Sequence, residues 1–169
     1  MKKVLAFVDD VYEDLELWYP KLRLEEEGIK VVVAGPKSNV VYKGKHGYPC
    51  KSDADLADVE ASQFDGLLVP GGFAPDKLRR DHNVLSLTRE FHAANKPIAF
   101  ICHAGWILIS ADILRGRKAT STVGIKDDMT NAGAEWLDQA LVVDGNLISS
   151  RTPVDLPVFA KAFVDAVLA

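Results

Sequence analysis

Cysteine is scarce in this chain of 169 residues, which contains only Cys50 and Cys102. Two cysteines cannot form an all-cysteine zinc site, and the four histidines show no HxxxH spacing, so we expect no metal site. The chain also lacks a phosphate-binding P-loop, and we expect no cofactor. Long apolar runs are missing as well. None approaches the ~18–20 residues that cross a bilayer, so we expect no membrane-spanning segment.

Positive charge is not in excess either. The formal net charge is −4, which leaves no basic field to hold nucleic acid or an anionic membrane surface. The N-terminal stretch MKKVLAFVDD starts like a signal peptide, but its apolar run ends at Val8 before two aspartates and is too short. We therefore predict a cytoplasmic protein whose two thiols are reduced.

The chain does contain a series of short, continuous apolar runs separated by helical patterns. Continuous runs are typical of strands covered on both faces, as in a parallel sheet between helix layers. The runs are VLAFV (4–8), VVVA (31–34), GLLVP (66–70), PIAFI (97–101), LVVD (141–144) and NLISS (146–150). They predict a single domain over residues 1–169, a flavodoxin-like three-layer α/β/α sandwich with a mostly parallel sheet. Residues 40–50 indicate a small β-hairpin beside that sheet.

Residues that typically begin or end helices support this interpretation. Gly28 ends a predicted helix over 14–27, Asn83 begins one over 83–94, and Thr152-Pro153 opens the last helix. Further helices are predicted over 103–114 and 126–133. In such folds, sites form outside the carboxyl ends of the strands, which here are followed by loops 9–14, 70–76 and 102–105.

Cys102 follows the fourth apolar run directly, where a strand should turn sharply into a helix. This is the geometry of a nucleophile elbow, which exposes one side chain at the top of a sheet. A helix N-terminus favours an anion, so we expect the thiol pKa to be lowered. The alternative is a buried structural thiol, since cysteine often follows apolar runs.

Three neighbouring features could assist Cys102. His103 could act as its base, although a histidine at a helix start can also face solvent. Gly71 and Gly72 could offer N–H groups for an oxyanion hole with His103 or Ala104, although Gly-Gly after a strand is often only a turn.

The acidic loop after the first strand is the third feature. Glu13 and Glu16 both lie at the sheet edge of Cys102, where a protonated carboxyl could donate to sulfur. Both could equally complement the dipole of the helix that they begin. Asp9-Asp10 resembles a response-regulator pocket, but the other loops carry Pro-Gly-Gly and Cys-His instead of the remaining receiver residues, so we exclude that class.

Taken in order, these motifs resemble the DJ-1/PfpI superfamily, most closely its PfpI branch. The resemblance covers essentially the whole chain and is carried by EDLELWYPKLRLEEEG, GKHGY, LLVPGGFAPDKLR, KPIAFICHAG, GIKDDMTNAGAEW and VVDGNLISSR. It implies that Cys102 is the nucleophile, that Glu13 contacts its sulfur and that His103 lies beside it. It also implies that Asp76 of a neighbouring subunit orients His103, which requires a homodimer or a trimer of dimers. Gly71 and Gly72 match the oxyanion loop.

Two positions depart from the pattern. Ala104 stands where relatives often have glycine, so a positive φ there would be strained. Thr122 stands near a position where PfpI relatives often have tyrosine, which would make the substrate side of the site more open.

The resemblance implies a cysteine-dependent hydrolase or lyase that attacks electrophilic carbonyls in stress protection. Its activities would be peptide hydrolysis, methylglyoxal conversion to lactate or removal of glycation adducts, so the partner would be a peptide, a small aldehyde or a glycated protein. Two alternatives use the same residues: a redox-sensing stress protein or chaperone without enzymatic activity, and an inactive member with an ordinary thiol pKa.

Overall fold

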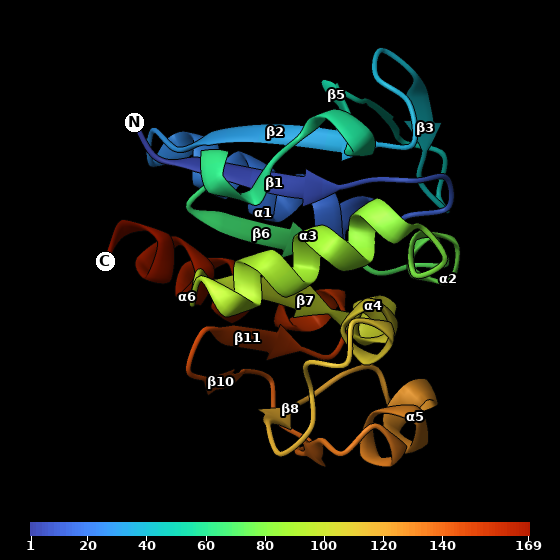
Figure 1. Cartoon of the computed structure of the whole chain (residues 1–169), viewed down its shortest axis with the longest axis vertical. Coiled ribbons are helices and arrows are strands. Elements are labelled where there is room, and N and C mark those ends of the chain that lie inside the picture. The colour runs from blue at the N-terminus through green and yellow to red at the C-terminus, as the bar shows by residue number, and fades with distance from the viewer.

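The computed structural model describes all 169 residues and places seven strands in one twisted sheet (Figure 1). The strand order is β10-β11-β7-β6-β1-β2-β5, and every neighbouring pair is parallel except β10 with β11. The strands are β1 (Lys3–Phe7), β2 (Lys30–Gly35), β5 (Ala54–Asp55), β6 (Gly66–Val69), β7 (Ile98–Ile101), β10 (Val142–Asp144) and β11 (Leu147–Ser150). The predicted fold class is therefore confirmed, and all six apolar runs lie on strands.

Helices cover both faces of the sheet. Helices α1 and α6 pack against each other on one face, whereas α3 packs against α4 on the other, nearer the viewer in Figure 1. The helices are α1 (Asp14–Glu26), α2 (Ala74–Leu78), α3 (His82–Ala93), α4 (Gly105–Ser110), α5 (Lys126–Asn131) and α6 (Leu156–Leu168). None of them combines the length and apolar character that crossing a membrane would take.

The central strands β6 and β7 are buried at every residue, which is why their sequences are continuously apolar rather than alternating. Helix α3 begins one residue earlier than predicted, because Asp81 rather than Asn83 provides the N-cap and accepts a hydrogen bond from Asn83 N at 2.8 Å. The predicted hairpin is present as β3 (Val41–Lys43) and β4 (Pro49–Lys51). A second small pair joins β8 (Lys118–Ala119) to β9 (Glu135–Trp136).

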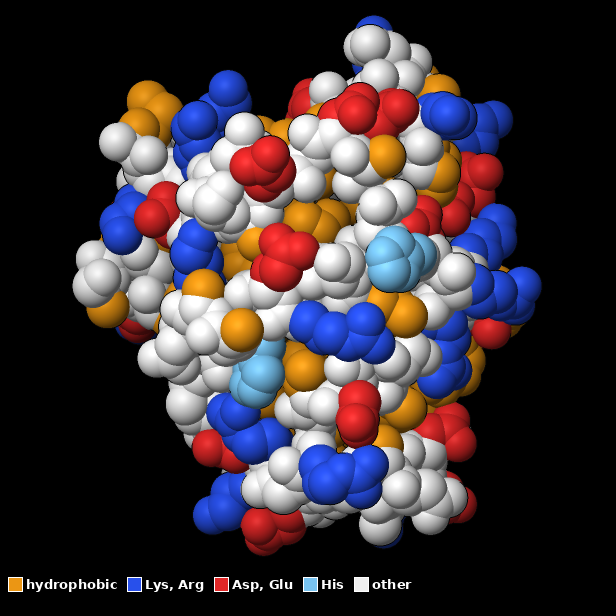
Figure 2. Space-filling model, viewed as in Figure 1, with side chains coloured by type: hydrophobic (Ala, Val, Ile, Leu, Met, Phe, Trp, Pro, Cys, Tyr) orange, Lys and Arg blue, Asp and Glu red, His pale blue; other side chains and the backbone are white.

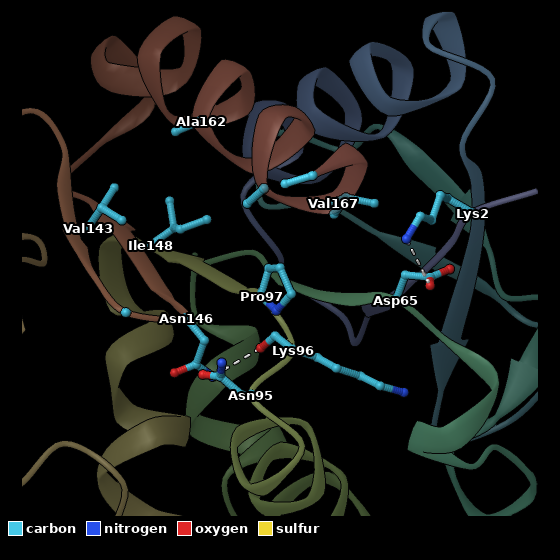
Figure 3. A pocket seen from close by; sticks show the side chains of 13 residues that line it. Lys2, Asp65, Asn95, Lys96, Pro97, Val143, Asn146, Ile148, Ala162 and Val167 are labelled. Carbon is cyan, nitrogen blue, oxygen red and sulfur yellow. Dashed lines mark hydrogen bonds and ion pairs between the residues drawn. The ribbon is translucent and has the colours of Figure 1, made fainter.

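Charged side chains of both signs are interspersed on the face that α3 covers, with no patch of a single sign (Figure 2). The two edges of the sheet differ. A cavity of about 520 Å³ lies at the edge where the parallel strands begin, between α6, β11 and the ion pair of Lys2 with Asp65 (Figure 3). At the opposite edge, the register of β1, β6 and β7 brings together the loops that follow these strands, and the candidate residues converge there.

Candidate active site

Cys102 occupies a strained turn between β7 and α4. Its φ is +63°, in the left-handed region, and residues Cys102–Ala104 form a single 3-10 turn before α4 begins. A residue with a Cβ in this region costs roughly 1–2 kcal/mol, which surrounding structure must hold in place. Ala104 does not adopt the positive φ that would be strained there: its φ is −60°, and the left-handed residue is Cys102, two positions earlier. This is the predicted elbow.

The thiol of Cys102 is mostly buried beside His103. Its Sγ lies 3.4 Å from Nδ1 of His103, and the backbone N–H of His103 also donates toward the sulfur. Burial, followed by the nearby carboxylate charge of Glu16, raises the thiol pKa to about 12. The expected lowering of this pKa is therefore wrong. The desolvation of a thiolate outweighs the few N–H groups that the 3-10 turn and the short helix α4 present.

The carboxyl group beside that sulfur belongs to Glu16, whereas the resemblance had implied Glu13. Glu16 is fully buried, and its Oε1 accepts a hydrogen bond from Gly71 N at 2.9 Å. Its Oε2 is buried without a partner. Burial, and next the charge of Glu13, raise the pKa of Glu16 to about 8, so its neutral form dominates at pH 7. A neutral carboxyl can donate its proton to sulfur.

Glu13 takes a different position because it is the N-cap of α1. Its Oε2 accepts from Glu16 N at 2.8 Å, and its Oε1 lies 3.9 Å from Nε2 of His46. Helical spacing explains why Glu16 and not Glu13 faces the sulfur. Glu16, Pro20 and Leu24 recur every four residues on the buried face of α1, whereas Glu13 precedes the helix as its N-cap. This four-residue spacing is visible in the sequence.

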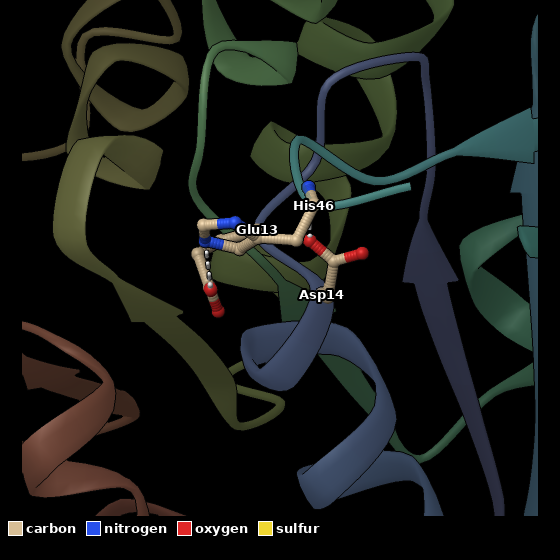
Figure 4. A group of neighbouring side chains, drawn as sticks. All are labelled: Glu13, Asp14 and His46. Carbon is tan, nitrogen blue, oxygen red and sulfur yellow. Dashed lines mark hydrogen bonds and ion pairs between the residues drawn. The ribbon is translucent and has the colours of Figure 1, made fainter. Parts of the chain in front are cut away.

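Glu13, Asp14 and His46 form a cluster at the start of α1 (Figure 4), with one ligand atom from each within 4.8 Å of the others. Both oxygens of Asp14 are already engaged, one by His46 N at 2.8 Å and one by Tyr48 N at 2.9 Å. The cluster therefore fastens the tip of the β3–β4 hairpin to the helix that carries Glu16.

The loop after β6 needs both of its glycines. A Cβ on Gly71 would lie 2.5 Å from Oε1 of Glu16 and 2.9 Å from Cβ of Cys102. Gly72 has φ +82°, and a Cβ there would meet the backbone of Val11 and Glu13 at 2.5 Å. The N–H of Gly71 is occupied by Glu16, so of these two glycines only Gly72, whose N–H makes no hydrogen bond in the chain, can offer an N–H to an oxyanion.

His103 lacks an orienting acceptor within its own chain. Its ring packs against Trp106 with centroids 5.0 Å apart, and burial followed by the charge of Lys45 lowers its pKa, so it is neutral at pH 7. Asp76 lies on α2 and pairs with Arg80, and it makes no hydrogen bond with His103 of the same chain.

With this geometry in view, comparison with known proteins identifies the family. The model for the DJ-1/PfpI family matches residues 2–166. The chain belongs to the DJ-1/PfpI family. It is 48% identical to a deglycase of Pyrococcus horikoshii over 96% of this chain and 97% of that protein. A Bacillus subtilis relative with a provisional cysteine-protease name is 41% identical over 95% of both chains.

Solved structures agree with this assignment to the DJ-1/PfpI family. A protein of Anabaena variabilis with a DJ-1/ThiJ/PfpI-like and a ferritin-like domain matches 98% of this chain with a TM-score of 0.96 and 43% identity. This chain spans about half of that protein, 48% of its length. DJ-1beta of Drosophila melanogaster matches 97% of this chain, with a TM-score of 0.90 and 30% identity, and 89% of that chain is covered.

A pocket of about 280 Å³ beside the elbow was not anticipated. Thr122 is one of its lining residues, and the Thr122 backbone N–H donates to the carbonyl oxygen of Cys102 at 3.2 Å. Trp136, Asp138 and Arg151 form other walls. Sequence reasoning had placed Thr122 near the substrate but missed Arg151, although it directly follows a strand at the same sheet edge.

Proposed function

We propose that this DJ-1/PfpI protein is an enzyme that uses Cys102 to attack electrophilic carbonyl compounds, as a deglycase or a peptidase. The observation that carries the proposal is the strained elbow. It holds a thiol between a neutral imidazole, a protonatable carboxyl group and a free backbone N–H. The relatives named as deglycases support the substrate class.

The first step follows from the two protonation states. At pH 7 the thiol of Cys102 keeps its proton and the imidazole of His103 is neutral, so Nδ1 can accept that proton as sulfur attacks. A bond forms between Sγ and the carbonyl carbon, and the π electrons move to the oxygen. The N–H of Gly72 is then available to stabilise this oxyanion, together with the backbone around Ala104.

Glu16 keeps the site neutral while this happens. Because its proton is bound at pH 7, its charge does not repel the forming thiolate, and its O–H can donate to sulfur or to the adduct. If the substrate is a peptide, the amine leaves with the proton from His103, and water hydrolyses the resulting thioester. Glycation adducts share the attack on a carbonyl and differ in the later bond-breaking steps.

The acceptor missing around His103 supports an oligomeric site as part of this proposal. Asp76 lies on a surface segment near Phe73, which is 52% exposed. In a homo-oligomer, this segment could meet a neighbouring subunit and bring Asp76 to its His103. A cytoplasmic location belongs to the same proposal, and both cysteines are free thiols.

The redox-sensor alternative fits less well. A sensor cysteine needs a low pKa and open access, whereas burial raises the pKa of Cys102 to about 12.

Substitution of the nucleophile tests the proposal. Cys102→Ser should lower turnover of methylglyoxal-glycated amino acids, methylglyoxal and peptides by roughly 10³-fold. Cys50→Ser is the matched control, because Cys50 lies on β4, and it should retain activity. Activity of the Cys102→Ser protein at the wild-type level would overturn the proposal.

A further inference from the structure

The pocket beside the elbow has an arginine, Arg151, among its lining residues. Ser150 of β11 pairs in register with Ile101 of β7, so Arg151 and Cys102 are the first residues beyond the same pair at the carboxyl edge of the sheet. Neighbouring strands lie ~4.8 Å apart. Arg151 and Thr122 line the same pocket, and Thr122 is bonded to the backbone of Cys102. Thr122 therefore links the pocket that Arg151 lines to the nucleophile.

Arg151 is held rigidly on one side. Its Nε and one terminal nitrogen donate to the two oxygens of Asp155 at 2.9 and 3.0 Å, and its backbone N–H donates to Asp155 at 3.0 Å. The side chain of Asp155 is only 3% exposed. A buried carboxylate that binds two nitrogens of a guanidinium group fixes the plane of that group. The remaining terminal nitrogen of Arg151 therefore points in a fixed direction.

That remaining nitrogen of Arg151 has a weaker partner. It donates to Oδ1 of Asp138 at 2.9 Å, but the Asp138 side chain is 72% exposed. Ion pairs with an exposed member contribute little to stability and exchange readily with solvent and with other anions. Asp138 therefore fills a carboxylate position that the pocket could offer to a ligand.

We infer that Arg151 binds the carboxylate of a small carbonyl substrate and presents the adjacent carbonyl carbon to Cys102, while Asp138 occupies that contact in the free protein. The pocket volume of about 280 Å³ is ample for an oxo acid of two or three carbons. The carbonyl part of the inference rests on the proposed function. With glyoxylate, an Sγ–C bond would form and the π electrons would move to oxygen, which takes up a proton. The product is a hemithioacetal, with no net oxidation.

Two alkylating reagents of the same shape test the carboxylate contact without relying on turnover. Iodoacetate carries a carboxylate and iodoacetamide a neutral amide, and with both the sulfur forms a C–S bond as iodide leaves. Mass spectrometry of the peptide that contains Cys102 gives the ratio of the two rates. Arg151→Gln should lower the iodoacetate-to-iodoacetamide ratio roughly tenfold or more, because a charge-assisted hydrogen bond is lost.

Asp138→Asn should change the ratio in the opposite direction and raise it several-fold, because a competing internal carboxylate is removed. This exposed position also tests the inference if Arg151→Gln does not fold. Asp165→Asn is the matched control: Asp165 pairs with Lys161 on α6, its removal changes the net charge equally, and the ratio should stay constant. An Asp138→Asn ratio equal to or below that of the wild type would overturn the inference.

Protection by glyoxylate separates this inference from the proposed function. Glyoxylate should slow alkylation of wild-type Cys102 by iodoacetamide, and Asp138→Asn should lower the concentration required. If turnover of all carbonyl substrates is absent while the alkylation ratios behave as expected, the proposed function fails and the carboxylate contact stands. If turnover is normal and the ratios do not respond, only the carboxylate contact fails.

Discussion

The carboxyl group of Glu16 accepts a hydrogen bond at 2.9 Å from the backbone N–H of Gly71 in a fully buried position. Its pKa rises from 4.5 in the unfolded chain to about 8 in the folded one. Between these values, the folded state retains a proton that the unfolded chain has released. The contribution of Glu16 to the free energy of unfolding therefore falls as pH rises, by roughly 3–5 kcal/mol, and levels off above pH 8.

Glu16→Gln should remove this dependence, since glutamine is neutral at every pH and can still accept from Gly71. The difference in the free energy of unfolding between the variant and the wild type should grow in favour of the variant from pH 5 to pH 8. Urea denaturation at several pH values measures it. Glu26→Gln is the control, because the Glu26 side chain is 66% exposed. A constant difference across this range would contradict the raised pKa of Glu16.

Alkylation kinetics should report the high pKa of Cys102 directly. Because burial raises this pKa to about 12, the rate of reaction with iodoacetamide should continue to rise through pH 10 without reaching a plateau. The Cys102→Ser protein corrects for Cys50, whose pKa burial raises to about 11. A rate that is half-maximal near pH 8.5, the pKa of a free cysteine, and level above about pH 10 would show that the site leaves the thiol unperturbed.

The strained backbone at Cys102 predicts that a glycine at this position stabilises the fold, although the protein loses its nucleophile. Glycine adopts φ +63° without the clash of a Cβ, so Cys102→Gly should be more stable than Cys102→Ala by about 1 kcal/mol. Both variants lack sulfur and should be inactive, so alanine is the matched reference for the backbone alone. Thermal or urea unfolding measures the difference. A Cys102→Gly protein less stable than Cys102→Ala would mean that the elbow stores no strain.

Much of the fold could be predicted from local sequence patterns. Strands β6 and β7 lie between two helix layers, so both of their faces are buried and their sequences are continuously apolar. This pattern can be recognised in the sequence alone. Boundaries were harder to place. Asp81 rather than Asn83 caps α3, since either residue can accept a backbone hydrogen bond and only the path of the chain decides between them.

The site was less predictable, because its properties depend on packing. The location of Cys102 followed from a strand that ends in a sharp turn. The direction of its pKa shift did not, because desolvation of the thiol depends on how Glu16 and the loop at Gly71 cover it. The place of Arg151 depends on the register of β11 against β7, which no local pattern of the sequence specifies.

The hairpin beside the site should depend on Asp14. Its two oxygens accept the N–H groups of His46 and Tyr48, so Asp14→Ala leaves two donors without a partner and should cost about 2–3 kcal/mol. Hydrogen exchange in residues 44–48 should accelerate. Asp10→Ala is the control: it removes a single exposed hydrogen bond from Lys43 N, where β3 enters the same loop, and should cost under ~1 kcal/mol. Equal effects of the two variants would show that the Asp14 cluster does not fasten the hairpin.

A site shared between subunits predicts that two inactive variants restore activity when they assemble together. If Asp76 orients His103 of a neighbouring subunit, then Cys102→Ser and Asp76→Ala should each be inactive or strongly impaired alone. A mixed pair contains one site with an intact Cys102 from one subunit and an intact Asp76 from the other. Unfolding and refolding the two together should therefore restore about a quarter of the wild-type activity in a dimer with two shared sites. If Asp76 acts within its own chain, no mixed site is complete and activity does not return. Refolding each variant alone controls for recovery from the procedure, and size-exclusion chromatography with light scattering verifies that the mixture has assembled.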